Sequence, residues 1–340
     1  MERQIIVYGN GSLGKRFQKG IKKYSKKISV NILDDNDPSC LKLRDLKKFN
    51  KNVLIIFCIW NGEANYFSLK KKLEKIGFKN IQHYKEIVYR HSFFKRYSMF
   101  NYQSDLKKNK YDFRKLKKNY ADKLSRKNFQ NFLKFYNKNI FLKKKPKFQL
   151  QLKLKKLKNI VNKFENFVDC GAYTGDSYLF YKRYIKFKKY IGIEPNLANY
   201  KILKKNIKKN KKVEIFNNFV YSHMCKPKKF TNINSMSLLG FGKKKIIKPV
   251  VLDNIINSDE RSIIKLDIEG YEKHALKGCK KLFLAKKSIF IISVYHSPKD
   301  FFYIADWINN SYQGYRFYLI IQNYDFVDSL LLVVPKSIDL

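Results

Sequence analysis

The stretch Phe167–Asp176, FVDCGAYTGD, decides the fold of the second half of this 340-residue chain. It begins as an apolar strand, and its glycines, Gly171 and Gly175, allow the backbone to turn tightly and approach a ligand that a Cβ would exclude. A helix follows, and then a second apolar strand that ends in Glu194 and Pro195. This order predicts a Rossmann-like sheet that holds a nucleoside-containing ligand.

The chemistry of this loop favours a cationic cofactor over a dinucleotide. Its pattern is D-x-G-A-x-x-G rather than G-x-G-x-x-G, and the carboxylate of Asp169 would repel a pyrophosphate but attract the ammonium and sulfonium groups of S-adenosylmethionine (SAM). Glu194 is expected to accept hydrogen bonds from both ribose hydroxyls. A helix cap for Asp169 and a surface ion pair for Glu194 are the alternatives. The residues expected at the cofactor are Asp169, Gly171, Ala172, Tyr173, Thr174, Gly175, Glu194, Pro195 and, at the adenine, Asn218.

Alternating strands and helices predict two doubly wound, Rossmann-like α/β domains. The first covers residues 1–90 and the second residues 164–340. Residues 91–163 combine lysines and aromatic residues at helical spacing, which predicts a helical bridge. The two final strands, expected at 315–321 and 330–334, are separated by a short turn. They are therefore expected to form an antiparallel hairpin at the edge of an otherwise parallel sheet, as in class I methyltransferases.

The N-terminal domain carries a second glycine loop between an expected strand and an expected helix. Gly9, Gly11 and Gly14 form G-x-G-x-x-G, and Asp34 follows at the end of the next strand. The surrounding block resembles the small domain in front of sugar-modifying enzymes, which implies a nucleotide-sugar-like ligand at these four residues. NAD is the rival ligand, and a docking domain without a ligand is the alternative.

Several blocks in the second half resemble the FkbM family of SAM-dependent methyltransferases. The resemblance covers residues 164–318, and its most specific block is KLDIEGYE at residues 265–272. It implies transfer of a methyl group from SAM to a hydroxyl, commonly on a sugar or related metabolite. The other matching blocks are Phe167–Asp176, Gly192–Pro195, Val251–Asp253 and Tyr295–Pro298.

Three residues are candidates for the catalytic step. His296 follows an apolar strand at the carboxyl edge of the sheet, and an imidazole that titrates near neutral pH suits a general base. Asp267 is the second candidate base, and Lys265 shares its strand face and is expected to pair with it. Glu269 or Glu272 is expected to order the following loop. A divalent cation on Asp267 and Glu269 is an alternative, but hard cations take about six oxygen ligands, and no metal site is expected.

Two alternative functions are compatible with the sequence, and the first of them follows from its charge. Lysines and arginines number 73 against 27 acidic residues, a formal charge of +46, which suits nucleic acid or an anionic membrane surface. Only ten residues are arginine, the residue that reads bases most often, so specific nucleic-acid binding is not expected. A nucleic-acid methyltransferase or binder is nevertheless one alternative, and a non-catalytic nucleotide-sugar-binding protein is the other.

The expected location is the cytoplasm. The five cysteines are scattered without a C-x-x-C pair, which is typical of a reduced, metal-free protein. The start of the chain leads directly into a strand and shows no signal-peptide pattern. The longest apolar run, residues 53–60, is far shorter than the ~20 residues of a membrane-spanning helix, although peripheral contact with an anionic membrane is compatible with the charge.

Overall fold

The structure, a computed structural model, describes residues 3–59, 66–97, 112–138, 142, 146, 148–207, 212–223, 228–233, 236–239 and 244–340. The chain divides into two compact units. Unit 1 comprises residues 1–109 and 134–143, and unit 2 comprises residues 110–133 and 144–340. The expected helical bridge over 91–163 is thus divided between the two units.

Unit 1 is built on a four-stranded parallel sheet of order β2-β1-β3-β4. Side chains alternate between its two faces because successive residues of a strand point in opposite directions. Val7 and Cys58 pack with α1 and α3, whereas Tyr8 contacts Phe57, whose ring also contacts Tyr66 of α2. The elements are β1 (Arg3–Tyr8), α1 (Ser12–Tyr24), β2 (Ile28–Leu33), η1 (Leu43–Lys48), β3 (Leu54–Phe57), α2 (Tyr66–Lys75), β4 (Ile81–His83), α3 (Tyr84–Arg90) and η2 (Ser92–Tyr97).

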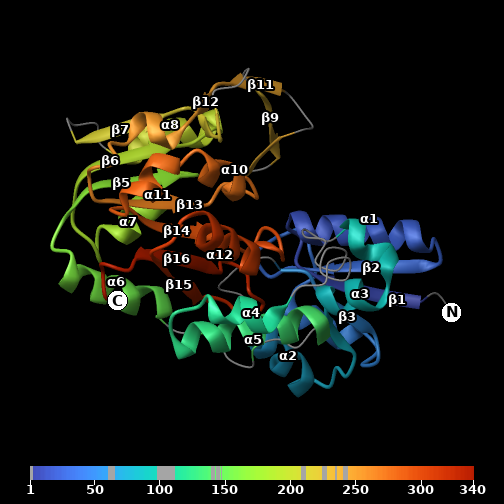
Figure 1. The fold of residues 1–340 in the computed structure, drawn as a ribbon. Coiled ribbons are helices and arrows are strands. Elements are labelled where there is room, and N and C mark those ends of the chain that lie inside the picture. Colours follow the sequence, from blue (N-terminus) through green and yellow to red (C-terminus); the bar gives the residue numbers. More distant parts are fainter. Residues whose placement is uncertain are drawn as a thin grey trace. The chain divides into compact units, whose positions relative to one another are not determined.

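Unit 2 is built on a seven-stranded sheet of order β15-β16-β14-β13-β5-β6-β7 (Figure 1). Five strands, β7, β6, β5, β13 and β14, run parallel to one another in that order. The strand β16 runs antiparallel to both β14 and β15. The last two strands therefore pair as expected from the sequence. The bounds are β5 (Phe164–Cys170), β6 (Phe187–Ile193), β7 (Val213–Phe216), β13 (Ser262–Leu266), β14 (Ile289–Ser293), β15 (Tyr315–Ile320) and β16 (Leu330–Pro335).

Helices cover the main sheet of unit 2 and close its core. In α6, Leu150, Leu154 and Leu157 recur at helical spacing and join the same core as Phe167 of β5, which explains why this part of the expected bridge docks on unit 2. The helices are α4 (Phe113–Lys118), α5 (Lys123–Lys138), α6 (Gln149–Ile160), α7 (Asp176–Tyr181), α8 (Leu197–Asn206), α9 (Leu252–Ile255), α10 (Glu272–Lys277), α11 (Lys280–Ala285) and α12 (Asp300–Ser311).

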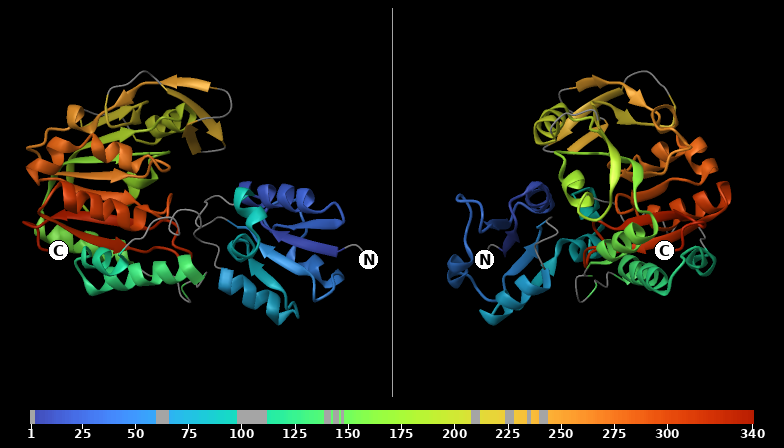
Figure 2. Two further views of the ribbon diagram at one scale, coloured as in Figure 1. Left: turned by 45° about the vertical axis from the view of Figure 1, so that its right-hand side comes forward. Right: turned by 90° about the vertical axis from the view of Figure 1, so that its left-hand side faces the viewer.

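Sequence reasoning missed an insertion between β7 and α9. The strand β7 ends at Phe216, and Phe219–Val220 forms a separate strand, β8, that pairs with β12 (Pro249–Val250). A three-stranded antiparallel sheet follows β8, made of β9 (Lys228–Ile233), β10 (Met236–Leu239) and β11 (Lys244–Ile247). It lies beside the part of unit 2 that contains β7 and α8 (Figure 2).

Within the described ranges, no helix combines sufficient length with sufficient apolar character to cross a bilayer.

Candidate functional site

A cavity of about 270 Å³ opens in unit 2 where parallel strands of the main sheet end. Parallel strands present their carboxyl ends at one edge, so the segments that follow β5, β6 and β13 meet there. Of the residues predicted at the cofactor, the wall contains Gly171, Tyr173, Glu194, Pro195 and Asn218. Lys265 and Asp267, two predicted catalytic residues, also belong to the wall.

Position 171 requires a glycine because the loop after β5 lies close to the end of β13. Its φ is +76°, in the left-handed region that favours glycine, and a Cβ built there would lie 1.9 Å from the carbonyl oxygen of Asp267. The loop after β5 therefore passes directly over the end of β13. Ala172, Thr174 and Gly175, which were predicted at the cofactor, shape this loop and are not part of the wall.

Glu194 binds the glycine loop from the end of β6. Its Oε2 accepts a hydrogen bond from the backbone N–H of Tyr173 at 2.9 Å, and its Oε1 accepts one from the N–H of Asn196 at 2.7 Å. The residue is buried yet reaches the cavity wall, and burial raises the pKa of its carboxyl to about 7. The carboxylate also accepts a hydrogen bond from the side chain of Asn199, and it keeps a lone pair for a ligand hydroxyl.

The sequence predicted that Asp169 contacts the cofactor. The structure instead places Asp169 beneath the cavity and outside its wall. Its side chain is fully buried, accepting hydrogen bonds from Lys265 Nζ at 3.1 Å and from the hydroxyl of Tyr190 at 3.2 Å. Asp267 Oδ2 is 3.8 Å from the same Nζ. Lys265 was expected to pair with Asp267, but the nearer partner is Asp169, which is its register partner on the adjacent strand. Burial opposes the charge on Lys265, but Asp169 and Asp267 outweigh it and raise the pKa of Lys265.

The neighbouring asparagines have different roles. Asn217 donates from Nδ2 to the carbonyl oxygens of Glu194 and Pro195, and so fixes the chain after β6. Asn218 reaches the wall, as predicted for the adenine contact, and donates to the carbonyl of Lys248. Eight residues of the wall were not predicted from the sequence. Most of them lie within or close to the quoted motifs, and that position in the sequence was the signal that could have found them. They are Asp176, Ser177, Ile193, Asn199, Phe219, Val220, Ile268 and Tyr271.

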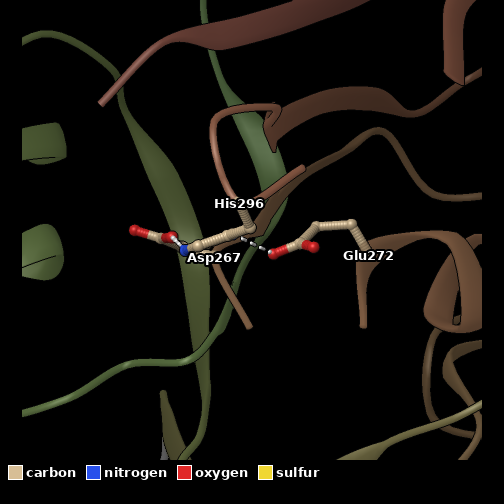
Figure 3. A group of neighbouring side chains, drawn as sticks. All are labelled: Asp267, Glu272 and His296. Carbon is tan, nitrogen blue, oxygen red and sulfur yellow. Dashed lines mark hydrogen bonds and ion pairs between the residues drawn. The ribbon is translucent and has the colours of Figure 1, made fainter. Parts of the chain in front are cut away.

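A buried histidine and three carboxylates lie beside the cavity. His296 follows β14, and Figure 3 shows its ring between Asp267 and Glu272. Its Nδ1 is 2.9 Å from Glu272 Oε1, and its Nε2 is 3.4 Å from Glu269 Oε2 and 3.7 Å from Asp267 Oδ1. Glu272 also accepts the backbone N–H of Ile268 at 2.9 Å, so it orders this loop as the sequence indicated.

His296 was predicted first as the general base, and its surroundings do not suit that role. Its side chain is 2% exposed and lies outside the cavity wall. Burial alone would lower the pKa of the imidazole, but Glu272, Asp267 and Glu269 outweigh burial and raise the pKa to about 9. An imidazole with this pKa already carries its proton at neutral pH.

The N-terminal glycine loop is held in place by hydrogen bonds within unit 1. Asp34 Oδ2 accepts the backbone N–H of Asn10 at 2.8 Å, which is the same arrangement as Glu194 and Tyr173 in unit 2. The side chain of Asn10 donates to Asp37 at 2.7 Å. A Cβ on Gly14 would lie 1.8 Å from the carbonyl oxygen of Gly9, so the helix begins in contact with the loop. A ligand at Gly9, Gly11, Gly14 and Asp34 stays a prediction.

Comparisons with known proteins place unit 2 in a functional class. Residues 169–317 match the Methyltransferase FkbM domain. The chain thus carries an FkbM-type methyltransferase domain and is a SAM-dependent methyltransferase. A search of curated proteins returned no match.

One solved structure resembles the chain in fold over nearly its whole length, and two others match about half of it. A methyltransferase FkbM from Methylobacillus flagellatus KT is 17% identical, with a TM-score of 0.68 over 98% of this chain and 90% of that one. An rRNA methylase from Streptococcus thermophilus is 12% identical over 57% of this chain and 98% of its own, with a TM-score of 0.36. A putative methyltransferase from Streptococcus mutans, in complex with SAH, is 11% identical over 54% and 96%, with a TM-score of 0.36.

The cavity fits SAM, the cofactor of this class. Glu194 would offer carboxylate oxygens to the ribose hydroxyls, and the absence of a Cβ at Gly171 leaves room for close backbone approach. Ile193, Phe219 and Val220 would offer an apolar surface to the adenine. Carboxylates on the remaining wall suit a cationic ligand.

Proposed function

We propose that the protein transfers the methyl group of SAM to a hydroxyl of a sugar, a glycan precursor or a related metabolite. The observation that carries this proposal is the charge of the wall beyond the glycine loop. Asp267 and Glu269 line the cavity, and Glu272 lies behind them. This acidic wall is found in a chain of net charge +46. Carboxylates accept hydrogen bonds from hydroxyls, and they repel phosphates.

The residues of the chain contribute mainly by positioning. When bound, SAM supplies an electrophilic methyl group on a sulfonium sulfur. Glu194 and the glycine loop hold the nucleoside part, so the acceptor is held against the wall that Asp267, Glu269 and Tyr271 form. The acceptor oxygen forms the new C–O bond, the C–S bond breaks with its electron pair going to sulfur, and the hydroxyl proton passes to the acidic wall or to water. Fixed geometry of this kind accounts for much of the rate in a displacement reaction.

The two rival functions are less consistent with this wall. A nucleic-acid acceptor would bring its phosphates close to Asp267 and Glu269. A non-catalytic nucleotide-sugar-binding protein would not need a cavity that fits SAM. Both rivals give distinct results in a transfer assay.

The assay uses SAM with a labelled methyl group and a panel of acceptors. Label in sugars or oligosaccharides, with equimolar release of SAH, is the expected result. Label confined to RNA or DNA, lost steeply with added salt, would favour the nucleic-acid function. SAM binding without transfer to any member of the panel would favour the non-catalytic one.

The affinity for SAM is expected to rise between about pH 6 and about pH 8. Burial raises the pKa of Glu194 to about 7, and only the ionised carboxylate accepts hydrogen bonds at both oxygens. Binding that requires this form weakens by up to about tenfold per pH unit below the pKa and levels off above it. The charged group that faces Glu194 is Asp169, which is bound to Lys265.

Calorimetric titrations with SAM across this pH range test the expectation. Glu194→Gln removes the titrating group. The affinity of this variant for SAM should therefore depend less steeply on pH than that of the wild type. An equally steep profile in the variant would assign the pH dependence to another residue.

A further inference from the structure

The group formed by Asp267, Glu272 and His296 has the composition and spacing of a cation site. The three residues come from the ends of adjacent parallel strands: Asp267 follows β13, His296 follows β14, and Glu272 begins α10 between them. One ligand-type atom from each lies within 4.8 Å of the other two. Ligands at about 2.2 Å from one ion are up to about 4.4 Å apart, so a small rotation of the partly exposed Asp267 carboxylate completes the set.

The backbone is shaped to bring Glu272 back to the sheet edge. Glu269 has a φ of 57°, and Gly270 has a φ of 94°. Two consecutive left-handed residues turn the chain after β13, so that α10 begins next to the end of β14. A left-handed conformation is unfavourable at a non-glycine residue, so the fold holds Glu269 in place against this cost.

The charges of this region do not balance. The carboxylates of Asp169, Asp267, Glu269 and Glu272 gather around one lysine, Lys265, and one imidazole, His296. Both Asp169 and Glu272 are completely buried. Buried charge is costly without a partner, so this arrangement favours a bound cation.

A second observation points to a ligand at the same place. The Oε2 atom of Glu272 is buried, and it has no hydrogen-bond partner among the described residues. Its other oxygen is bound by His296 and by the backbone of Ile268. A buried carboxylate oxygen normally has at least one partner, and a metal ion can be that partner.

We propose that Asp267, Glu272 and the neutral imidazole of His296 bind a divalent cation of the Mn²⁺ type, with the Glu269 carboxylate beside it. The cation takes the place of a proton on the imidazole, which is released when the metal binds. This differs from the sequence-based expectation of no metal site. One imidazole and two carboxylates suit a first-row transition metal better than Mg²⁺, which takes oxygen ligands almost exclusively. Three protein ligands leave coordination positions open toward the cavity, because Asp267 is part of its wall.

The cation would define how the acceptor binds, and this part rests on the proposed function. A hydroxyl oxygen that occupies an open position is held next to the cofactor cavity and becomes more acidic on the metal. Acceptors with two adjacent hydroxyls, as sugars have, can occupy two such positions. The proposed site thus favours a vicinal diol over an isolated hydroxyl.

The test is a titration of the full, EDTA-treated chain with MnCl₂ without SAM, in which the loss of free Mn²⁺ is followed by electron paramagnetic resonance. We expect one Mn²⁺ bound per chain, and weaker binding of Mg²⁺ in competition. His296→Gln and Glu272→Gln should each weaken Mn²⁺ binding by at least about tenfold. Glu214→Gln, which removes an exposed carboxylate paired with Lys189, is the matched control and should bind as the wild type does.

Calorimetry with SAM on the same variants separates this proposal from the proposed function. Neither His296 nor Glu272 lines the cavity, so SAM binding by these variants shows that they are folded. Absence of Mn²⁺ binding by a wild type that binds SAM would overturn the metal site alone. Unchanged Mn²⁺ binding in both variants would also overturn it, by placing the ion elsewhere. Mn²⁺ binding lost in both variants, with no transfer to any hydroxyl, would support the site and contradict the proposed function.

Discussion

Replacing Lys265 with methionine is expected to lower the free energy of unfolding of unit 2 by about 3–5 kcal/mol. Methionine fills a similar volume but leaves the carboxylate of Asp169 buried without its cation. The Asp169 side chain has no solvent exposure, and its remaining side-chain partner is the hydroxyl of Tyr190. Urea-induced unfolding followed by circular dichroism measures the change.

The double variant tests whether the charge pair is the cause. Adding Asp169→Asn to Lys265→Met removes the uncompensated charge, so it should restore most of the lost stability. Lys188→Met, which removes the cation of the exposed pair with Glu165, is the control and should change stability by less than about 1 kcal/mol. If Lys265→Met behaves like this control, the buried pair does not stabilise unit 2.

Glu194→Ala is expected to weaken SAM binding by roughly 100-fold or more. The variant loses two hydrogen bonds between a charged acceptor and the ribose, each contributing about 1.5–3 kcal/mol. It also frees the backbone N–H of Tyr173, which holds the glycine loop. Calorimetry with SAM at about pH 8, where Glu194 is mostly ionised, measures the change most directly.

A matched substitution separates the ribose contact from a general effect of lost charge. Glu165→Ala removes an exposed carboxylate from β5 in the same unit, and its affinity for SAM should equal that of the wild type. Circular dichroism of both variants checks that unit 2 is folded. An affinity within a few-fold of wild type for folded Glu194→Ala would rule out the ribose contact.

The elements and the position of the cavity followed from local patterns in the sequence. The segment 167–176 forms a strand and a glycine loop as predicted, and Glu194 follows the next strand and lies in the cavity wall. These features depend on residues that are close in sequence. Backbone geometry and hydrophobic periodicity are sufficient to predict them.

The parts that could not be predicted depend on pairing between distant segments. Asp169 is held away from the cavity by Lys265, and only the register of β5 against β13 makes them partners. The pKa of His296 depends on three carboxylates that the turn at Glu269 gathers around it. The insertion between β7 and α9 was missed because its strands are short and pair with one another or with β8.

The hydrogen bonds of Glu194 also have a consequence for the energetics of ligand capture. One carboxylate joins the loop after β5 to the chain after β6, through the amides of Tyr173 and Asn196. These segments are thereby fixed before any nucleoside arrives, and the ligand does not have to order them. Less conformational entropy is lost on association, so more of the contact energy contributes to affinity. Unit 1 uses Asp34 in the same way, so both halves of the chain present a preorganised loop.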